Sequence, residues 1–282
     1  MRWKQGRRSS NIQDRRGTRV GRGMKLGGGT IVIALIAMLL FGENPFSILE
    51  QLGGGAAQQP ASSPSQDGSD ELADFVSVVL ASTEDVWFEY FAQSGQRYPQ
   101  PQLVLFSDAV QSACGFNSSA TGPFYCPADQ QVYLDLSFLA ELRRLGAHGD
   151  FAFAYVIAHE VGHHVQTITG LSDEVQRLRA QSSQTVANQL SVLQELQADC
   201  YAGMWARRAN DRERILEPGD VEEGLRAAAS IGDDRLQRMS GRSVQPESFT
   251  HGSSEQRVHW FRTGLEHADA QACDTFGDVG LP

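Results

Sequence analysis

Positive charge is scarce over most of this 282-residue chain. The whole chain has a formal net charge of −10, yet residues 1–25 hold nine Lys or Arg against the single acid Asp14, a net charge of +8. Residues 26–282 therefore carry −18. Because binding to nucleic acid needs a basic face, this distribution excludes a nucleic-acid partner for the main domain.

Cysteine is also rare, with four in the chain, and no two of them have the C-x-x-C spacing of a cysteine-liganded zinc site. An even number in an exported domain indicates disulfides, for which three connectivities exist. Cys114 and Cys126 bracket a segment rich in Gly, Asn and Ser, the usual setting of a loop closed by a disulfide. We expect the pairs Cys114–Cys126 and Cys200–Cys273; buried free thiols are the alternative.

Long apolar runs are few, and the candidate is residues 26–42, seventeen uncharged residues between Lys25 and Glu43. As a helix they would span about 25 Å, slightly less than the roughly 30 Å of a bilayer core. They could be the apolar region of a signal peptide or an uncleaved anchor, and the missing small-x-small cleavage signature favours the anchor. The basic residues before the anchor should stay in the cytoplasm. We expect a single-pass protein of the bacterial inner (cytoplasmic) membrane, in contact with the lipid bilayer, with its C-terminal domain extracytoplasmic.

Composition divides the chain into four parts. Residues 1–25 read as a basic cytoplasmic arm, 26–42 as the transmembrane anchor and 43–70 as a flexible linker rich in Gly, Ala, Gln, Pro and Ser. Residues 71–282 read as one folded domain without an internal repeat, since a hydrophobic content of 41% permits a sizeable core.

The early part of the domain combines helices and strands. Residues 72–80 and 86–91 predict two helices, with Thr83 as N-cap of the second. Residues 103–106 and 131–136 predict strands. The second strand is either an edge strand that pairs with an extended peptide substrate or an internal strand.

The most informative motif is His-Glu-Val-Gly-His at residues 159–163. It follows the Gly- and Pro-free run 151–158, which predicts a helix, so His159 and His163 project from one face and can bind one Zn²⁺. Glu160, beside the first histidine, can act as the catalytic base. His164 lies about 100° around the helix, which indicates a packing or surface role.

A catalytic zinc needs a third protein ligand and an open position. Glu195 and Asp199 lie four residues apart in a second stretch of helical periodicity, so they also share a face. We expect Glu195 to complete the zinc ligands, one Zn²⁺ per chain. Asp199 would accept the free ring N–H of a ligand histidine, or else it is a capping or surface acid.

The two motifs together, H-E-x-x-H and E-x-x-x-D, resemble those of the gluzincin metallopeptidases. Over roughly residues 70–280 the chain is similar to the bacterial putative neutral zinc metallopeptidase family, in the segments Ala158–Gln166, Glu195–Gly203, Ile231–Gln237, Thr250–Ser253 and Cys273–Phe276. This resemblance implies an α+β, zincin-like fold, mostly helical, with a small sheet before the active-site helix. The anchor adds one N-terminal transmembrane helix to that fold.

The resemblance also points to His251. It lies in Thr-His-Gly-Ser, which is similar to the Thr-His-Pro segment of related membrane gluzincins, and a histidine there could stabilise an oxyanion. The alternative is that His251 caps the helix that begins near Ser253. The remaining histidines, His148, His259 and His267, are expected to be structural or exposed.

These observations predict a membrane-anchored zinc-dependent endopeptidase that acts on a peptide or protein substrate. The alternative is a catalytically silent, zinc-stabilised binding domain of the cell envelope. Glu160 favours the enzyme, because a purely structural zinc would not need it and would take a fourth protein ligand. A cytoplasmic redox or signalling domain would require the opposite topology and reduced cysteines.

Overall fold

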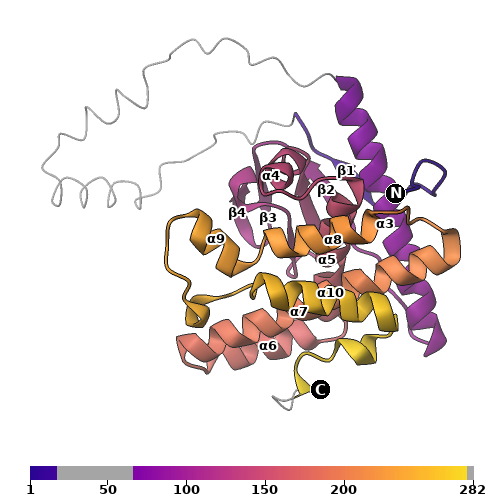
Figure 1. Ribbon diagram of the computed structural model, residues 1–282. Helices are drawn as coiled ribbons and strands as arrows, with labels where there is room; N and C mark the ends of the chain where they lie inside the picture. The colour runs from indigo at the N-terminus through magenta and orange to yellow at the C-terminus, as the bar shows by residue number, and fades with distance from the viewer. Residues whose placement is uncertain (18–65, 278–282) are drawn as a thin grey trace, which may run out of the picture. The chain divides into compact units, whose positions relative to one another are not determined.

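The computed structural model describes residues 1–17 and 66–277 (Figure 1). Residues 1–17 and 70–277 belong to one compact unit, and residues 66–69, the first turn of helix α3, belong to a second. The compact unit combines helices with small sheets, in agreement with the mixed composition expected from the sequence.

The principal sheet has four strands in the order β1-β2-β6-β5. Its β1–β2 and β2–β6 pairs are parallel, whereas the β5–β6 pair is antiparallel. A separate antiparallel hairpin is formed by β3 and β4. The strands are β1 (Ile12–Asp14), β2 (Gln102–Phe106), β3 (Ala109–Ser112), β4 (Gly115–Ser118), β5 (Phe124–Cys126) and β6 (Gln131–Asp135).

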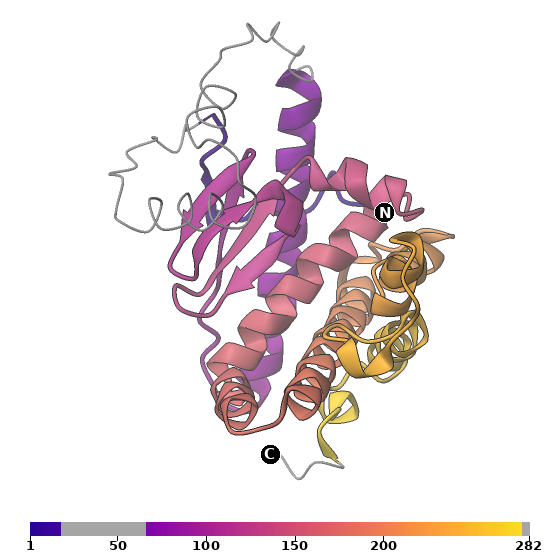
Figure 2. The same ribbon diagram turned by 90° about the vertical axis from the view of Figure 1, so that its left-hand side faces the viewer.

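Helices make up most of the described chain. They are α3 (Gln66–Gln93), α4 (Phe138–Arg144), α5 (Asp150–Ile168), α6 (Leu171–Ala180), α7 (Gln184–Glu213), α8 (Asp220–Ser230), α9 (Asp233–Met239) and α10 (Ser254–His267), with the short 3-10 helices η1 (Ser119–Thr121), η2 (Pro246–Ser248) and η3 (Ala270–Cys273). Figure 2 shows α5 between the sheet and the layer that contains α7, α8 and α10. Because neighbours cover it on both sides, every residue from Phe151 to Gly162 is buried.

Two glycines bring α7 and α10 into backbone contact. A Cβ atom built on Gly264 of α10 would lie 1.8 Å from the carbonyl oxygen of Cys200, and one built on Gly203 of α7 would lie 2.0 Å from that of Phe261. Only glycine fits at such an approach. The contact fixes the position of α10 relative to the helix that carries Glu195.

Both expected disulfides are confirmed. Cys114 pairs with Cys126, with Cα atoms 5.8 Å apart, and Cys200 pairs with Cys273, with Cα atoms 5.5 Å apart. The first ties β5 to the end of the β3–β4 hairpin, and the second ties η3 to α7.

Residues 1–17 pack on the domain, contrary to the expected separate basic arm. Strand β1 extends the sheet beside β2, with Ile12 opposite Leu103. Glu84 of α3 is 1% exposed, and its carboxylate accepts hydrogen bonds from Arg7 (2.8 Å), Ser9 (2.5 Å) and Asn11 (2.8 Å). The basic segment therefore supplies the donors for an acid buried in the domain.

The structure contradicts the expected transmembrane helix and the expected single-pass localisation. Within 1–17 and 66–277, no helix is both long and apolar enough to cross a bilayer. The longest, α7, has a polar average composition, and α5 contains the motif's acid and histidines. Residues 1–17 and the domain share one sheet, whereas the prediction separated this arm from the domain. The segment 26–42 and the predicted linker as far as residue 65 lie outside the described residues.

Helix α3 is continuous where the sequence predicts a break. Residues 72–80 and 86–91 belong to one helix, and Thr83 is fully buried inside it rather than at an N-cap. Its hydroxyl donates to the carbonyl oxygen of Leu80 (2.7 Å), so a polar side chain is satisfied within the helix.

The strand at residues 131–136 is internal. Strand β6 pairs with β2 on one side and with β5 on the other, so of the two alternatives for this strand the structure shows the internal one. The edge nearest α5 is β5, which contacts that helix.

Candidate metal centre

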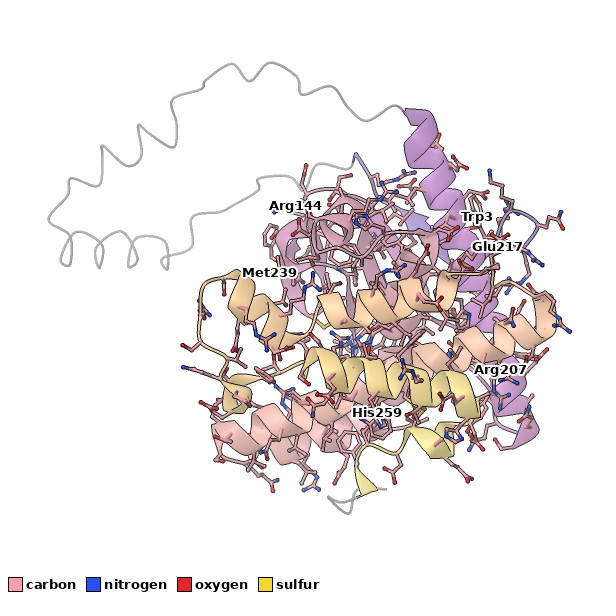
Figure 3. The ribbon with its side chains drawn as sticks, viewed as in Figure 1. Trp3, Arg144, Arg207, Glu217, Met239 and His259 are labelled. Atoms are coloured by element: carbon pink, nitrogen blue, oxygen red, sulfur yellow. A yellow bond between two sulfur atoms is a disulfide. The ribbon has the colours of Figure 1, made fainter. Side chains whose placement is uncertain are left out.

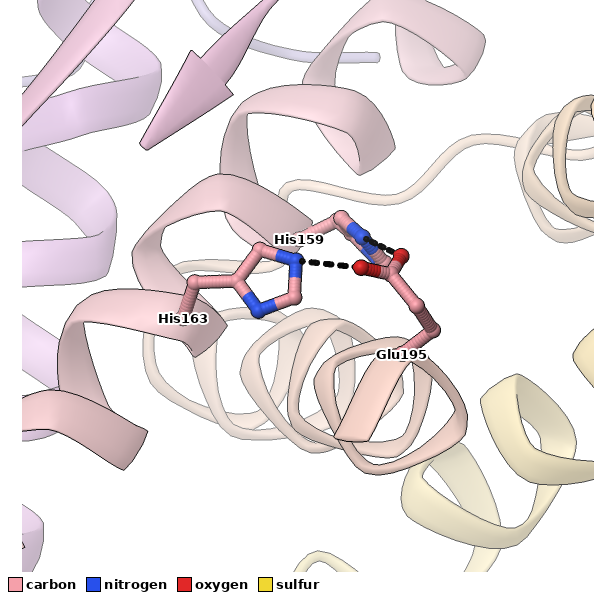
Figure 4. A group of neighbouring side chains, drawn as sticks. All are labelled: His159, His163 and Glu195. Carbon is pink, nitrogen blue, oxygen red and sulfur yellow. Dashed lines mark hydrogen bonds and ion pairs between the residues drawn. The ribbon is translucent and has the colours of Figure 1, made fainter. Parts of the chain in front are cut away.

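Three side chains from two helices meet at one point (Figure 4). His159 and His163 project from successive turns of α5 toward Glu195 of α7. The Nε2 atom of His159 lies 3.1 Å from Oε2 of Glu195, and the Nε2 atom of His163 lies 3.3 Å from Oε1. One possible ligand atom from each of the three lies within 4.8 Å of the other two.

This donor set fits a zinc ion. Two imidazole nitrogens and a carboxylate are ligand types that zinc takes in catalytic sites, with bonds of about 2.0–2.2 Å. A tetrahedron of that size has edges of about 3.3 Å, close to the two separations between His159, His163 and the Glu195 carboxylate. The structure thus brings the three predicted ligands together.

Asp199 lies behind His159. Its Oδ1 atom is 2.8 Å from Nδ1 of His159, so an N–H at Nδ1 donates to the carboxylate and leaves Nε2 free to face Glu195. Arg257 of α10 binds both oxygens of Asp199, from Nε (2.8 Å) and Nη2 (2.9 Å), and the hydroxyl of Tyr155 also donates to it. Asp199 and Arg257 are almost fully buried, so this pair is shielded from water.

The neutral side chain of Gln166 forms a hydrogen bond with His163. Oε1 of Gln166 lies 2.9 Å from Nδ1 of His163. The Gln166 amide nitrogen donates to the backbone oxygen of Gln194 (2.7 Å) and to Gln197 (2.9 Å), which directs its oxygen toward the histidine. Both histidine rings are therefore held so that Nε2 faces the Glu195 carboxylate.

The charges of the cluster compensate one another. Burial alone would lower the pKa of His159, but the carboxylates of Asp199 and Glu195 outweigh it and raise this pKa to about 10. Burial would raise the pKa of Glu195, yet His163 and His159 hold it well below its usual value. The carboxylates thus favour protonation of the histidines at this point. A bound cation would displace these protons.

Glu160 lies beside these three side chains in a cavity of about 440 Å³. The side chains of His159, His163, Glu195 and Arg257 also line this cavity. Glu160 is 7% exposed, and its burial raises the pKa of its carboxyl group, while the neighbouring histidines act in the opposite direction. The cavity provides room for a substrate directly next to the predicted base.

His251 faces the same cavity from the loop before α10. Its Nδ1 atom lies 3.2 Å from Oδ1 of Asp233, and this hydrogen bond raises the pKa of His251. Oδ2 of Asp233 accepts from the backbone N–H groups of Thr250 (2.7 Å), His251 (2.7 Å) and Gly252 (3.2 Å), so one carboxylate shapes the whole loop. The cap of α10 is Ser253 in a capping box, so His251 does not cap that helix.

The other histidines lie away from the cluster. His164 is fully buried, with Nε2 2.7 Å from the carbonyl oxygen of Pro99, and burial lowers its pKa to about 4. It therefore packs in its neutral form. His148, His259 and His267 are exposed, as Figure 3 shows for His259 on α10.

Arg257 and Gln166 were not predicted from the sequence. A signal for Arg257 existed, because it lies four and seven residues before Phe261 and Gly264 and so shares the buried face of α10. A charged residue on such a face requires a buried partner. No comparable pattern identifies Gln166.

Comparisons with known proteins identify the family of the chain. The family model described as Putative neutral zinc metallopeptidase matches residues 1–276, which confirms the resemblance seen in the motifs. Uncharacterized protein YpfJ of Escherichia coli (strain K12) is 45% identical over 285 residues, covering 98% of this chain and 99% of that protein. Uncharacterized protein Rv2575 of Mycobacterium tuberculosis is 43% identical over 195 residues, covering 65% of each. No solved structure is significantly similar to the chain.

Proposed function

This chain belongs to the Putative neutral zinc metallopeptidase family, and from that premise we propose that it is a zinc-dependent endopeptidase of the gluzincin type. The observation that carries the proposal is the convergence of His159, His163 and Glu195 beside Glu160 in one cavity. The family implies zinc, and the three side chains would hold one ion per chain.

Zinc in such a site supplies Lewis-acid polarisation of a carbonyl oxygen and a lowered pKa for water. The protein's own contribution begins with the second layer of contacts. Asp199 and Gln166 hold His159 and His163 in the orientation that presents Nε2, which preserves the site's geometry through a catalytic cycle.

Glu160 is the proposed general base. In this role its carboxylate takes the proton from the attacking water and then returns it to the nitrogen of the leaving amine. Its position in the cavity wall, next to His159 in the chain, supports the assignment.

His251 is the proposed donor to the oxyanion that develops on the substrate carbonyl. Asp233 would be its positioning residue, since it binds Nδ1 and so leaves Nε2 available to the cavity. The three backbone hydrogen bonds to Asp233 keep this arrangement rigid without contribution from the substrate.

The competing function is a catalytically silent, zinc-stabilised binding domain. A structural zinc site has four protein ligands and no access for a substrate. Here three ligand side chains face a cavity that also holds an acid and a histidine, which supports the peptidase.

The test compares the full zinc-loaded chain with Glu160→Gln, His159→Ala and the control Glu222→Gln, an exposed acid on α8. Each protein is analysed for bound zinc and incubated with a proteome-derived peptide library read by mass spectrometry. We expect His159→Ala to lose zinc, and Glu160→Gln to keep zinc but lose about 10²–10⁴-fold in cleavage rate. Wild-type rates for Glu160→Gln would remove the base from the mechanism. No cleavage by any zinc-loaded protein would favour the binding domain.

A further inference from the structure

We infer that the cavity beside Glu160 selects peptide segments with a bulky apolar side chain next to the scissile bond. The inference rests on the proposed peptidase function and names its substrate class. It follows from the walls of the cavity, from the polar groups that line it and from the place of one valine.

The walls are formed by apolar side chains from several separate elements. Strand β5, helix α4, the turn after α4, α5, the end of α8 and α9 each contribute one. These residues are Phe124, Phe138, Leu145, Val156, Ile231 and Leu236. Apolar surface that lines a cavity binds an apolar side chain, because contact removes both surfaces from water.

Within the described part of the chain, the charged residues that line the cavity already have roles. Glu195 forms the proposed metal site with the two histidines, and the guanidinium of Arg257 is bound to Asp199. Glu160 and His251 are reserved for the reaction. A charged substrate side chain placed against the apolar walls would therefore lose its hydration without contacting an opposite charge on those walls.

Val156 links the apolar wall to Glu160, because both side chains line the cavity. It lies four residues before Glu160 on α5, so the two side chains share a face of the helix one turn apart. If a substrate carbonyl lies at Glu160, the neighbouring side chain of the substrate is within reach of Val156, one helical turn away. Burying a side chain such as Leu changes affinity by about 10- to 100-fold relative to one left in water.

Helix α9 offers a matched pair of variants. Leu236 and Met239 are both exposed, at 38% and 58%, and lie three residues apart on this short helix. Leu236 lines the cavity, whereas Met239 does not and lies at the outer surface (Figure 3). Leu236→Glu therefore adds a charge to the cavity wall, and Met239→Glu adds the same charge to the same helix outside it.

The first experiment measures binding without turnover. The zinc-loaded full chain is titrated by calorimetry with leucine hydroxamate and with asparagine hydroxamate, which have side chains of similar shape but different polarity. We expect wild type and Met239→Glu to prefer the leucine compound by about 10-fold or more, and Leu236→Glu to lose most of that preference. Equal affinities of the wild type for the two compounds, or the same preference in both variants, would overturn the inference.

The second experiment separates the inference from the proposed function. Cleavage sites from the peptide library are aligned to find the residues on both sides of the broken bond. Cleavage with Leu, Phe or similar residues at one flanking position supports the inference, and cleavage indifferent to both flanking residues overturns it. If the leucine compound is preferred but no peptide is cleaved, the selective cavity stands and the peptidase assignment fails.

Discussion

Arg257→Leu should weaken both the fold and the zinc site. Arg257 is 2% exposed and binds both oxygens of Asp199, which is fully buried. Two opposite charges about 4 Å apart attract by about 4 kcal/mol at the effective dielectric constant of a protein. Removing Arg257 also leaves the Asp199 carboxylate buried without this counter-charge. Breaking a buried ion pair in this way typically lowers the free energy of unfolding by about 3–5 kcal/mol.

The effect should reach the metal through His159. Asp199 would keep the hydrogen bonds from His159 and Tyr155, but without Arg257 its position would be less fixed. Loss of such outer contacts typically costs about 10- to 100-fold in metal affinity. We therefore expect a smaller free energy of unfolding in urea for the zinc-free protein, and a weaker zinc affinity in a competition titration.

Two further variants test whether the effect comes from the Asp199–Arg257 pair. Arg262→Leu, an exposed residue on the same helix, should stay within about 0.5 kcal/mol of the wild type. The double variant Asp199→Asn/Arg257→Leu has no unpaired charge. Its decrease in the free energy of unfolding should therefore be at least about 1 kcal/mol smaller than the sum of the decreases in the two single variants. If Arg257→Leu behaves like Arg262→Leu in both assays, the Asp199–Arg257 pair supports neither the fold nor the zinc site.

Three other predictions concern the contacts that hold the domain together. Ser9→Ala removes a donor to the buried carboxylate of Glu84 and should lower the free energy of unfolding by about 1–3 kcal/mol in urea; an unchanged midpoint would contradict this role of the N-terminal segment. Gly264→Ala places a Cβ atom 1.8 Å from the backbone oxygen of Cys200, so we expect at least about 1–3 kcal/mol of destabilisation in thermal melts, and a melting temperature equal to that of wild type would show that the helices can separate freely. Cys273→Ala opens a loop of 73 residues and should cost about 4 kcal/mol by chain entropy, measured against the wild type without reductant; a loss below about 1 kcal/mol would mean that packing alone holds η3.

Local periodicity accounts for what the sequence predicts well. His159 and His163 lie four residues apart on one helix, and so do Glu195 and Asp199, so each pair shares a face once the helix is recognised. That the two faces meet depends on the packing of α5 against α7, which the sequence indicates only through the resemblance to a family.

Two of the contacts that the sequence does not predict are made between residues far apart in the chain. Arg257 acts on a carboxylate 58 residues away in the chain, and the partner of Glu84 is a segment more than 70 residues earlier. Thr83 reads as a helix cap because its hydroxyl is polar, but the buried helix satisfies that hydroxyl internally. Local composition predicts polar residues to be exposed to water. At these positions other groups of the folded chain provide the hydrogen bonds that water would otherwise provide.

The place of β1 in the sheet has a consequence for how the protein is made. Its partner β2 follows late in the chain, with Leu103 lying 91 residues after Ile12. At translation rates of about 5–20 residues per second, the strand waits roughly 5–20 s at the ribosome before its neighbour is synthesised. An apolar strand exposed for that time would invite aggregation. The arginine-rich sequence of residues 1–17 suits a strand that must remain in water first and enter the sheet afterwards.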